Sequence, residues 1–312
     1  MEPPEDPKER SLDVGQDTEA SGGIEALPQR VQRYGEAKKR ALDVAHFMGD
    51  QGKELQVIAE RVRGCGEYLL FRHYFTVDQV RLHAASFCMK HLLCPLCAIR
   101  RGTKALKAYL DRWEVIQSEK PDLKPFLVTL TVKDGPNLGE RFRHLHDAQR
   151  ALWMRKHRKR GCVLDGVQGA VWSYEFKRGD GSGLWHPHLH MIALAEVEPS
   201  QLRLRREWEQ ITGDSFMCDV RPIRGDTPDD LAKGFMEVFK YALKFSAQEP
   251  ADTVHAFQVL KGRRLMDCAG AFRGVEVPES LTDETLDGLP FVELFYRYLG
   301  GGYSLAKGRQ AA

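Results

Sequence analysis

The stretch LWHPHLHMIAL, residues 184–194, places histidines at three alternate positions, His186, His188 and His190. Alternate residues of a β-strand point to the same face, with Cα atoms about 6.6 Å apart. Two imidazoles in this arrangement can bind one metal ion, and imidazole suits Mn or Zn better than Mg. We predict a metal site at His188 and His190, with His186 outside it. The alternative is a polar pair on the solvated face of an edge strand.

Two neighbouring stretches bear on this site. Glu175, in VWSYEFK, is the nearest carboxylate able to lie beside the pair across a hairpin, and we predict it as a third ligand. The alternative is an ordinary exposed acid. RHLHDAQ, residues 143–149, also spells His-Leu-His, at His144 and His146. That segment has a helical pattern, and on a helix residues i and i+2 diverge by about 200°. This second pair is therefore predicted to be a solvated surface.

A second chemical candidate is the segment KGFMEVFKYALKF, residues 233–245, which carries Glu237 and Tyr241. The i, i+4 spacing places both on one face of a helix. A phenol with a pKa near 10 is rarely ionised at neutral pH, but it can attack phosphorus if a metal polarises the phosphate. A carboxylate one turn away could then activate water for a second transfer. By itself, the pattern also fits a core tyrosine beside a surface glutamate.

Cysteines form a third group. Cys94-Pro-Leu-Cys97 resembles a zinc knuckle, Cys88 precedes it by six residues, and Cys65 stands between two glycines. We predict that these four thiolates close a structural zinc site, with His91 or His83 as possible substitute ligands. A redox Cys-x-x-C or buried free cysteines are the alternatives.

Composition narrows the class of protein. The 312 residues contain seven cysteines, an odd number that favours a reducing cytoplasm over a disulfide framework. No apolar run is long enough to predict a membrane helix. Residues 1–30 are acidic and Pro/Gly-rich, without the apolar region of a signal peptide, and are predicted to be a disordered tail.

Basic residues are concentrated in one place although the net charge is only +2. Residues 141–160 hold eight Lys or Arg against a single acid, Asp147. Such a block is either a solvated helix face or a surface that follows phosphates. On the second interpretation the residues predicted to contact DNA are Arg155, Lys156, Arg158, Lys159 and Arg160.

The elements that would position these residues alternate between helices and strands. Helices are predicted at 31–62, 99–118, 138–160, 199–212 and 229–246, and strands at 126–133, 169–177, 187–195 and 216–223. The turn RGDGSG joins the second and third of these strands into a hairpin. We predict an α+β fold with a mainly antiparallel sheet flanked by helices. The predicted regions are a tail (1–30), a helical, Cys-rich zinc segment (31–118), a core (119–250) and a C-terminal extension (251–312).

The order of four motifs resembles a known family. FLVTLTVKD, WHPHLHMI, EVFKYALK and CGEYLLF…FCMKHLLCPLCAIRRG are similar to segments of rolling-circle replication initiators of small bacterial plasmids. The chain resembles the single-tyrosine group of the HUH (His-hydrophobic-His) endonucleases over about residues 60–275. The resemblance implies a palm-like antiparallel sheet with the histidine pair on a central strand and the tyrosine on a nearby helix.

The same resemblance implies roles for single residues. His188 and His190 would bind Mg or Mn, Tyr241 would nick one DNA strand and keep its 5′ phosphate, and Glu237 would direct the water that ends the cycle. Lys244 matches a lysine common in that helix and would touch phosphate. The implied partners are single-stranded origin DNA of a plasmid, the host helicase and the replication machinery, in a bacterial cytoplasm.

Three alternative functions remain at this point. The H-x-H-x-H text also fits a histidine-triad nucleotide hydrolase, which would need neither metal nor Tyr241. A zinc-stabilised DNA-binding module would bind an origin without cutting it. A transposase or a conjugative relaxase would use the same chemistry, although relaxases usually carry the tyrosine near the N-terminus.

Overall fold

The computed structural model describes residues 22–158, 161–179, 181–223, 228–246 and 248–310. These residues form two compact units, and each unit is discontinuous in the sequence. The first unit comprises the described parts of 22–105, 242–257 and 277–310, and the second comprises 106–241 and 258–276. Both units contain an antiparallel sheet, which confirms the predicted α+β class.

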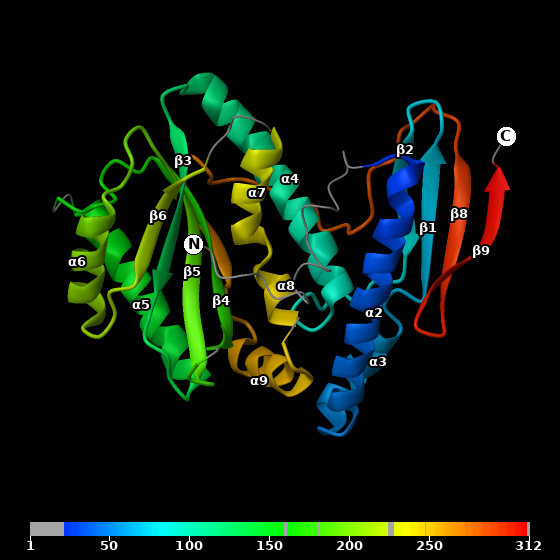
Figure 1. Ribbon diagram of the computed structural model, residues 1–312, viewed down its shortest axis with the longest axis horizontal. Helices are drawn as coiled ribbons and strands as arrows, with labels where there is room; N and C mark the ends of the chain where they lie inside the picture. The colour runs from blue at the N-terminus through cyan, green and yellow to red at the C-terminus, as the bar shows by residue number, and fades with distance from the viewer. Residues whose placement is uncertain (1–21, 159–160, 180, 224–227, 247, 311–312) are drawn as a thin grey trace. The chain divides into compact units, whose positions relative to one another are not determined.

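The second unit is built on a five-stranded antiparallel sheet of order β6-β3-β5-β4-β7 (Figure 1). The strands are β3 (Lys124–Thr131), β4 (Gly169–Arg178), β5 (Trp185–Ala195), β6 (Cys218–Pro222) and β7 (Met266–Gly270). The four predicted strands are all present, and β4 and β5 form the expected hairpin. The chain therefore places its histidine-bearing strand, β5, in the middle of the sheet.

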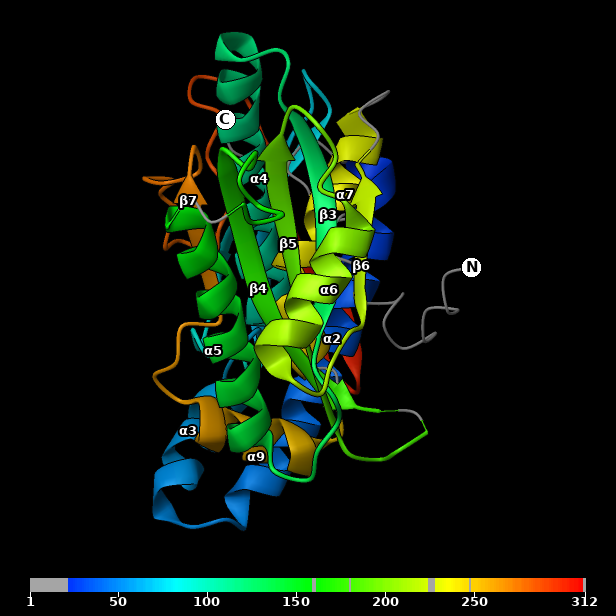
Figure 2. The ribbon, with the colours of Figure 1, turned by 90° about the vertical axis from the view of Figure 1, so that its left-hand side faces the viewer.

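Helices cover both faces of this sheet. On one face lie α5 (Leu138–His157) and α6 (Gln201–Thr212), which stand in front of the sheet in Figure 2. Phe142 of α5 packs against Tyr174 and Phe176 of β4. On the other face α7 (Pro228–Phe239) packs against β4 and β5. Residues 106–119 of α4 (Pro95–Glu119) support α7, with Trp113 against Phe235.

The first unit contains a four-stranded sheet of order β2-β1-β8-β9. Its strands are β1 (Tyr68–Tyr74), β2 (Gln79–Ala85), β8 (Val292–Leu299) and β9 (Gly302–Gln310), and its helices include α2 (Leu27–Gly49), α3 (Lys53–Arg63) and α9 (Pro250–Leu260), whose last residues belong to the second unit. A short 3-10 helix, η2 (Ile24–Ala26), precedes α2. One face of the sheet packs on α2, where Tyr34 stacks against Phe71. The far ends of the sequence thus meet in one sheet, because β1 pairs with β8.

Two predicted helices are interrupted. The helix expected at 31–62 is divided into α2 and α3 at Gly52, whose φ of 102° lies in a region that a helix cannot use. The helix expected at 229–246 ends at Phe239, and α8 (Tyr241–Ser246) begins after a turn at Lys240. Glu237 and Tyr241 therefore stand on two consecutive helices and not on one.

Every helix among the described residues is too short or too polar to span a lipid bilayer.

Candidate functional site

Two adjacent strands at the centre of the second unit bring together Glu175, His188 and His190. In the register of β4 and β5, Glu175 lies opposite His188. The Nε2 atom of His188 is 2.9 Å from Oε2 of Glu175, and Nε2 of His190 is 3.4 Å from the same oxygen. One ligand atom from each residue lies within 4.8 Å of the others, so the three could hold a single metal ion.

The surroundings of this group favour a cation. The Glu175 side chain is 2% exposed, and those of His188 and His190 are 11% and 12% exposed. A buried carboxylate is costly unless positive charge compensates it. Thr129 of β3 lies opposite His190, with its Oγ1 3.1 Å from Nδ1, and this contact fixes the ring so that Nε2 turns to Glu175. That Nε2 is buried and has no hydrogen-bond partner among the described residues, as expected of an atom reserved for a ligand.

The donor set also suits chemistry. Two imidazoles and one carboxylate match the preferences of a divalent ion such as Mn²⁺ or Zn²⁺. A site with three protein ligands keeps at least one position for water or substrate, whereas a structural zinc site is closed by four. Glu175, His188 and His190 could therefore bind an ion that still accepts a further ligand.

His186 lies outside the group, as the sequence analysis expected. Its Nδ1 is 2.6 Å from Oδ1 of Asp134, and Ser182 donates a hydrogen bond to the other carboxylate oxygen. Burial alone would raise the pKa of Asp134, but these hydrogen bonds hold that pKa below its ordinary value. Lys177 of β4 stands opposite His186 of β5, two residues along the hairpin from the pair formed by Glu175 and His188. The end of the site where the hairpin turns thus carries Asp134, Lys177 and His186.

Glu237 and Tyr241 lie on two consecutive helices, the first of which, α7, packs on the histidine-bearing side of the sheet. Glu237 lies near the end of α7, which packs against β4 and β5, and it forms an ion pair with Lys240. Tyr241 is the first residue of α8 and is half-buried. Lys244 is also half-buried, one turn further along α8.

The four predicted zinc ligands converge in the first unit. The Sγ atoms of Cys65, Cys88, Cys94 and Cys97 are mutual neighbours, with separations of 3.5 Å for Cys65–Cys97, 3.6 Å for Cys88–Cys97 and 3.5 Å for Cys94–Cys65. Sulfurs about 2.3 Å from a tetrahedral zinc ion lie about 3.8 Å apart, so the spacing fits zinc. Neither His83 nor His91 belongs to this group.

The charges of the thiols also fit a cation. All four are buried. Hydrogen bonds from neighbouring thiols, Cys65 first, and burial raise the pKa of Cys94 and Cys97 above the ordinary range, while hydrogen bonds from Cys65 and its neighbours lower that of Cys88. All four sulfurs could therefore act together as thiolate ligands only with a positive ion among them.

The local fold explains why these cysteines meet. Cys65 precedes β1, Cys88 follows β2, and the remaining pair brackets the start of α4. Gly66 turns the chain with a φ of +67°, and a Cβ there would lie 2.6 Å from the Leu96 side chain. Lys38 donates a hydrogen bond to the carbonyl of Cys65. The cluster thus ties both ends of the β1–β2 hairpin to α4.

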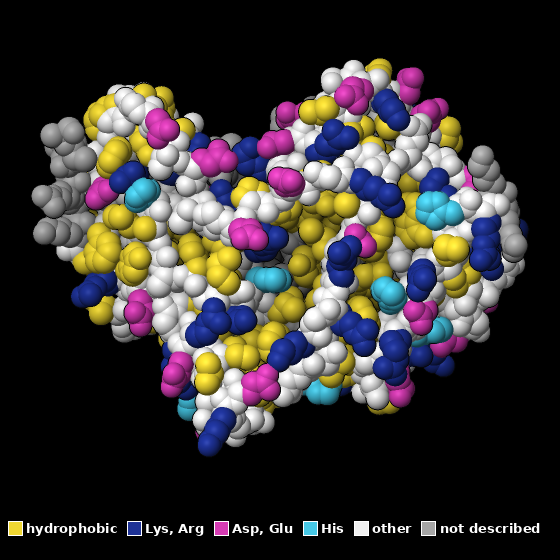
Figure 3. Space-filling model, turned by 180° about the vertical axis from the view of Figure 1, so that it is seen from behind, with side chains coloured by type: hydrophobic (Ala, Val, Ile, Leu, Met, Phe, Trp, Pro, Cys, Tyr) yellow, Lys and Arg dark blue, Asp and Glu magenta, His cyan; other side chains and the backbone are white. Residues whose placement is uncertain are grey.

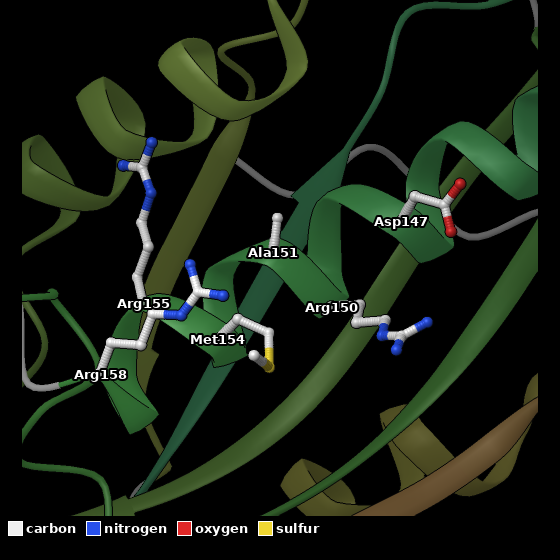
Figure 4. A pocket seen from close by; sticks show the side chains of 6 residues that line it. All are labelled: Asp147, Arg150, Ala151, Met154, Arg155 and Arg158. Carbon is white, nitrogen blue, oxygen red and sulfur yellow. The ribbon is translucent and has the colours of Figure 1, made fainter.

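The basic segment forms the exposed side of α5. A shallow pocket there is lined by Asp147, Arg150, Ala151, Met154, Arg155 and Arg158. Figure 4 shows the guanidinium groups of the three arginines extending from this segment. Arg155 also reaches Gln210 of α6, and Lys156 donates a hydrogen bond to the carbonyl of Asp165. Lys159 and Arg160 lie outside the described residues. Figure 3 shows Lys and Arg side chains spread over the surface seen from behind.

Sequence reasoning missed Thr129 and Asp134 as parts of the site. A strand was predicted at 126–133, but none of its side chains was given a part in the site. Its alternation places Thr129 on the face of the histidines, a signal that becomes readable only once β3 is known to lie beside β5. The contact of Asp134 with His186 depends on a loop and has no such periodic signal.

Comparison with known proteins gives a consistent result. Residues 79–293, more than half of the chain, match a family described as "Replication protein". A curated "Protein rep" of Streptococcus pneumoniae serotype 2 (strain D39 / NCTC 7466) is 27% identical over 213 residues, which cover 63% of this chain and 64% of that protein. A "Protein rep" of Lactiplantibacillus plantarum is 24% identical over 245 residues, covering 72% of this chain and 76% of that protein. A third, from Bacillus sp, is 29% identical over 170 residues, 53% of each chain.

The chain therefore spans less than two thirds of the length of the first and third of these relatives. No solved structure matches the chain significantly.

Proposed function

The chain belongs to this family of replication proteins, and from that premise we propose that it initiates rolling-circle replication of a plasmid. In this proposal the protein is a metal-dependent endonuclease and strand transferase that nicks single-stranded origin DNA. The carrying observation is the Glu175, His188 and His190 group on the central strands of the second unit. The proposed partners are origin DNA, a host helicase and the replication machinery, in a bacterial cytoplasm.

We assign the second unit to the HUH endonuclease fold. An antiparallel sheet with the histidine pair on a central strand and a helix against that strand supports this assignment. In it, Glu175, His188 and His190 would hold Mg²⁺ or Mn²⁺, which when bound would supply Lewis-acid polarisation of a phosphate. The imidazole-rich donor set favours Mn²⁺ over Mg²⁺.

Tyr241 is the proposed nucleophile. Its phenolic oxygen attacks the phosphorus, the bond from phosphorus to the 3′ oxygen breaks, and the proton of the phenol ends on the departing 3′ hydroxyl. The DNA strand remains joined through its 5′ phosphate to the tyrosine, which conserves a phosphodiester bond for later transfer. Lys244 and a basic group made up of Arg155, Lys156, Arg158, Lys159 and Arg160 are proposed to contact the DNA backbone.

Glu237 is the proposed general base of the second transfer. One tyrosine holds a single DNA end, so a second nick needs another nucleophile, and a carboxylate can take the proton of a water molecule. The ion pair with Lys240 holds the carboxylate of Glu237 at the end of α7.

The four thiolates are proposed to hold a structural zinc ion. Four buried sulfur ligands leave no coordination position for a substrate, so this ion would brace the β1–β2 hairpin against α4 and take no part in catalysis.

The decisive experiment looks for the covalent intermediate. Incubation with a labelled single-stranded origin oligonucleotide and Mn²⁺ or Mg²⁺ should give an adduct that survives denaturation and is lost with EDTA. Tyr241→Phe should abolish it, and Tyr298→Phe, a half-buried tyrosine of the first unit, should retain it. An adduct of undiminished yield in Tyr241→Phe contradicts the proposal.

Glu237→Ala separates the two transfers. The first nick should proceed and the adduct should accumulate, while turnover beyond the first adduct falls. If Glu237→Ala loses nicking as completely as Tyr241→Phe, its assigned role is wrong.

A further inference from the structure

The sheet of the first unit has two different faces. Its inner strands, β1 and β8, pair in regular register, so successive residues alternate between the faces. Phe71 and Tyr296 belong to the face that packs on α2. The opposite face, which we call the outer face, carries Tyr68, Leu70, Arg72, Glu293, Phe295 and Arg297. Figure 1 shows these strands between β2 and β9.

Aromatic rings occupy the middle of the outer face. Tyr68 and Phe295 stack with ring centroids 5.7 Å apart and an angle of 27° between the planes. Both side chains are only partly buried, although apolar rings of this size are usually removed from water. A pair of rings on the inner strands of an open antiparallel sheet is suited to stacking against another planar group.

Positive charge surrounds these rings. Arg297 of β8 is exposed and pairs with Tyr68 of β1. Arg72 of β1 pairs with Arg81 of β2. The guanidinium of Arg72 lies 4.2 Å from the ring centroid of Phe291 and forms an ion pair with Glu293. Three guanidinium groups therefore face one carboxylate, which leaves the outer face with an excess of positive charge.

We propose that this outer face binds single-stranded DNA, separately from the nicking residues of the second unit. A base would stack on the Tyr68–Phe295 pair, and the guanidinium groups of Arg72, Arg81 and Arg297 would contact the backbone phosphates. Stacking on aromatic side chains combined with cationic contacts is how proteins hold single strands without reading their sequence. An apolar protein partner would instead desolvate these guanidinium groups and offer them no new polar contact.

The thiol cluster gives this surface a fixed shape. Cys65 and Cys88 flank the β1–β2 hairpin, and both belong to the group that ties the hairpin to α4. Arg72 and Arg81 are therefore held on strands whose ends are anchored, which reduces the entropy lost when DNA binds.

The test measures binding of a fluorescent oligo-dT by anisotropy, with the full chain carrying Tyr241→Phe so that no covalent adduct forms. Phe295→Ala and Tyr68→Ala should each weaken binding about tenfold. Arg297→Glu should weaken it and reduce the slope of log Kd against log salt by about one. Lys53→Glu, the same charge change on exposed α3 of this unit, should leave both unchanged.

Photo-crosslinking keeps the test independent of any variant's folding. An oligonucleotide containing 5-iodo-deoxyuridine, irradiated with the otherwise unaltered chain, should crosslink to peptides that contain Tyr68 or Phe295. Unchanged affinity in the variants with crosslinks elsewhere overturns the proposal, and so does a protein dimer that Phe295→Ala dissociates. Adduct formation by the Arg297→Glu chain with wild-type Tyr241, on a short oligonucleotide, should persist, so this inference and the nicking proposal can fail separately.

Discussion

Two buried polar groups of the first unit, the four thiols and Asp283, are enclosed by partners from the same unit, whereas the buried Glu175, His188 and His190 of the second unit offer too few ligand atoms to close a metal site. The four cysteines are each at most 4% exposed, and their sulfur atoms contact one another. Asp283 is similarly enclosed, since it accepts hydrogen bonds from Arg30, Arg100 and the amide of Leu82. Glu175, His188 and His190 supply only three ligand atoms. We therefore propose a stabilising role for the first set and a catalytic role for the second.

The largest effect should come from opening the thiol cluster. Cys94→Ser removes one of four thiolates, and because a structural zinc site contributes directly to folding, the chain should lose its bound zinc and several kcal/mol of stability. Metal analysis and thermal denaturation measure these losses. Cys218→Ser, at a half-buried cysteine outside the cluster, is the control. Full zinc content and an unchanged melting temperature in Cys94→Ser would contradict a stabilising role for the four thiols.

Removing a ligand of the open site should have the opposite profile. His190→Ala should reduce nicking about 10³-fold, equivalent to about 4 kcal/mol of transition-state stabilisation, because the ion is lost. Its melting temperature should change little. The matched control is His146→Ala, in the other His-Leu-His stretch, where the ring is half-buried on α5 and stacks on Phe142. Equal loss of nicking in both variants would refute the assignment.

Asp283 tests enclosure without a metal. Burial alone would raise the pKa of Asp283, but the charges of Arg100 and Arg30 lower that pKa below its ordinary value. The folded pKa is therefore below the unfolded pKa of about 3.9, so the stabilisation is complete above that pH and is lost as the pH falls below it. Asp283→Asn should cost about 3 kcal/mol at neutral pH. Denaturant titrations at pH 7 and pH 3 should show the variant's deficit shrinking in acid, and a constant deficit would contradict this explanation.

The smallest expected effect sharpens the open site. Thr129→Val keeps the shape of the side chain but removes the contact with Nδ1 of His190. Loss of such an orienting partner typically weakens metal binding 10- to 100-fold, and we expect about tenfold. A Mn²⁺ titration of nicking measures it, with Thr131→Val, opposite His188, as the neighbouring control. Equal Mn²⁺ requirements for Thr129→Val and the unaltered chain would show that the contact does not orient the ligand.

Prediction from sequence worked where the signal is local. Four of the five strands of the second unit begin and end within two residues of their predicted positions, because alternation and turn residues mark them. The short edge strand β7 was not predicted. The strands of the first unit were not predicted. Phe71 and Leu294 pair across most of the chain, and no local pattern reports such a partner. The break at Lys240 is likewise unannounced, since Glu-Val-Phe-Lys-Tyr contains neither Gly nor Pro.

The sequence by itself determined which side chains share a face, because the two-residue period of a strand follows from covalent geometry. That period placed His188 and His190 together, and the Cys-x-x-C spacing kept Cys94 close to Cys97. Only the tertiary structure decided which distant groups complete each cluster. Strand register brought Glu175 to His188, and the packing of the β1–β2 hairpin on α4 brought Cys65 to Cys97. Such contacts depend on how separate elements fit together, which no local repeat encodes.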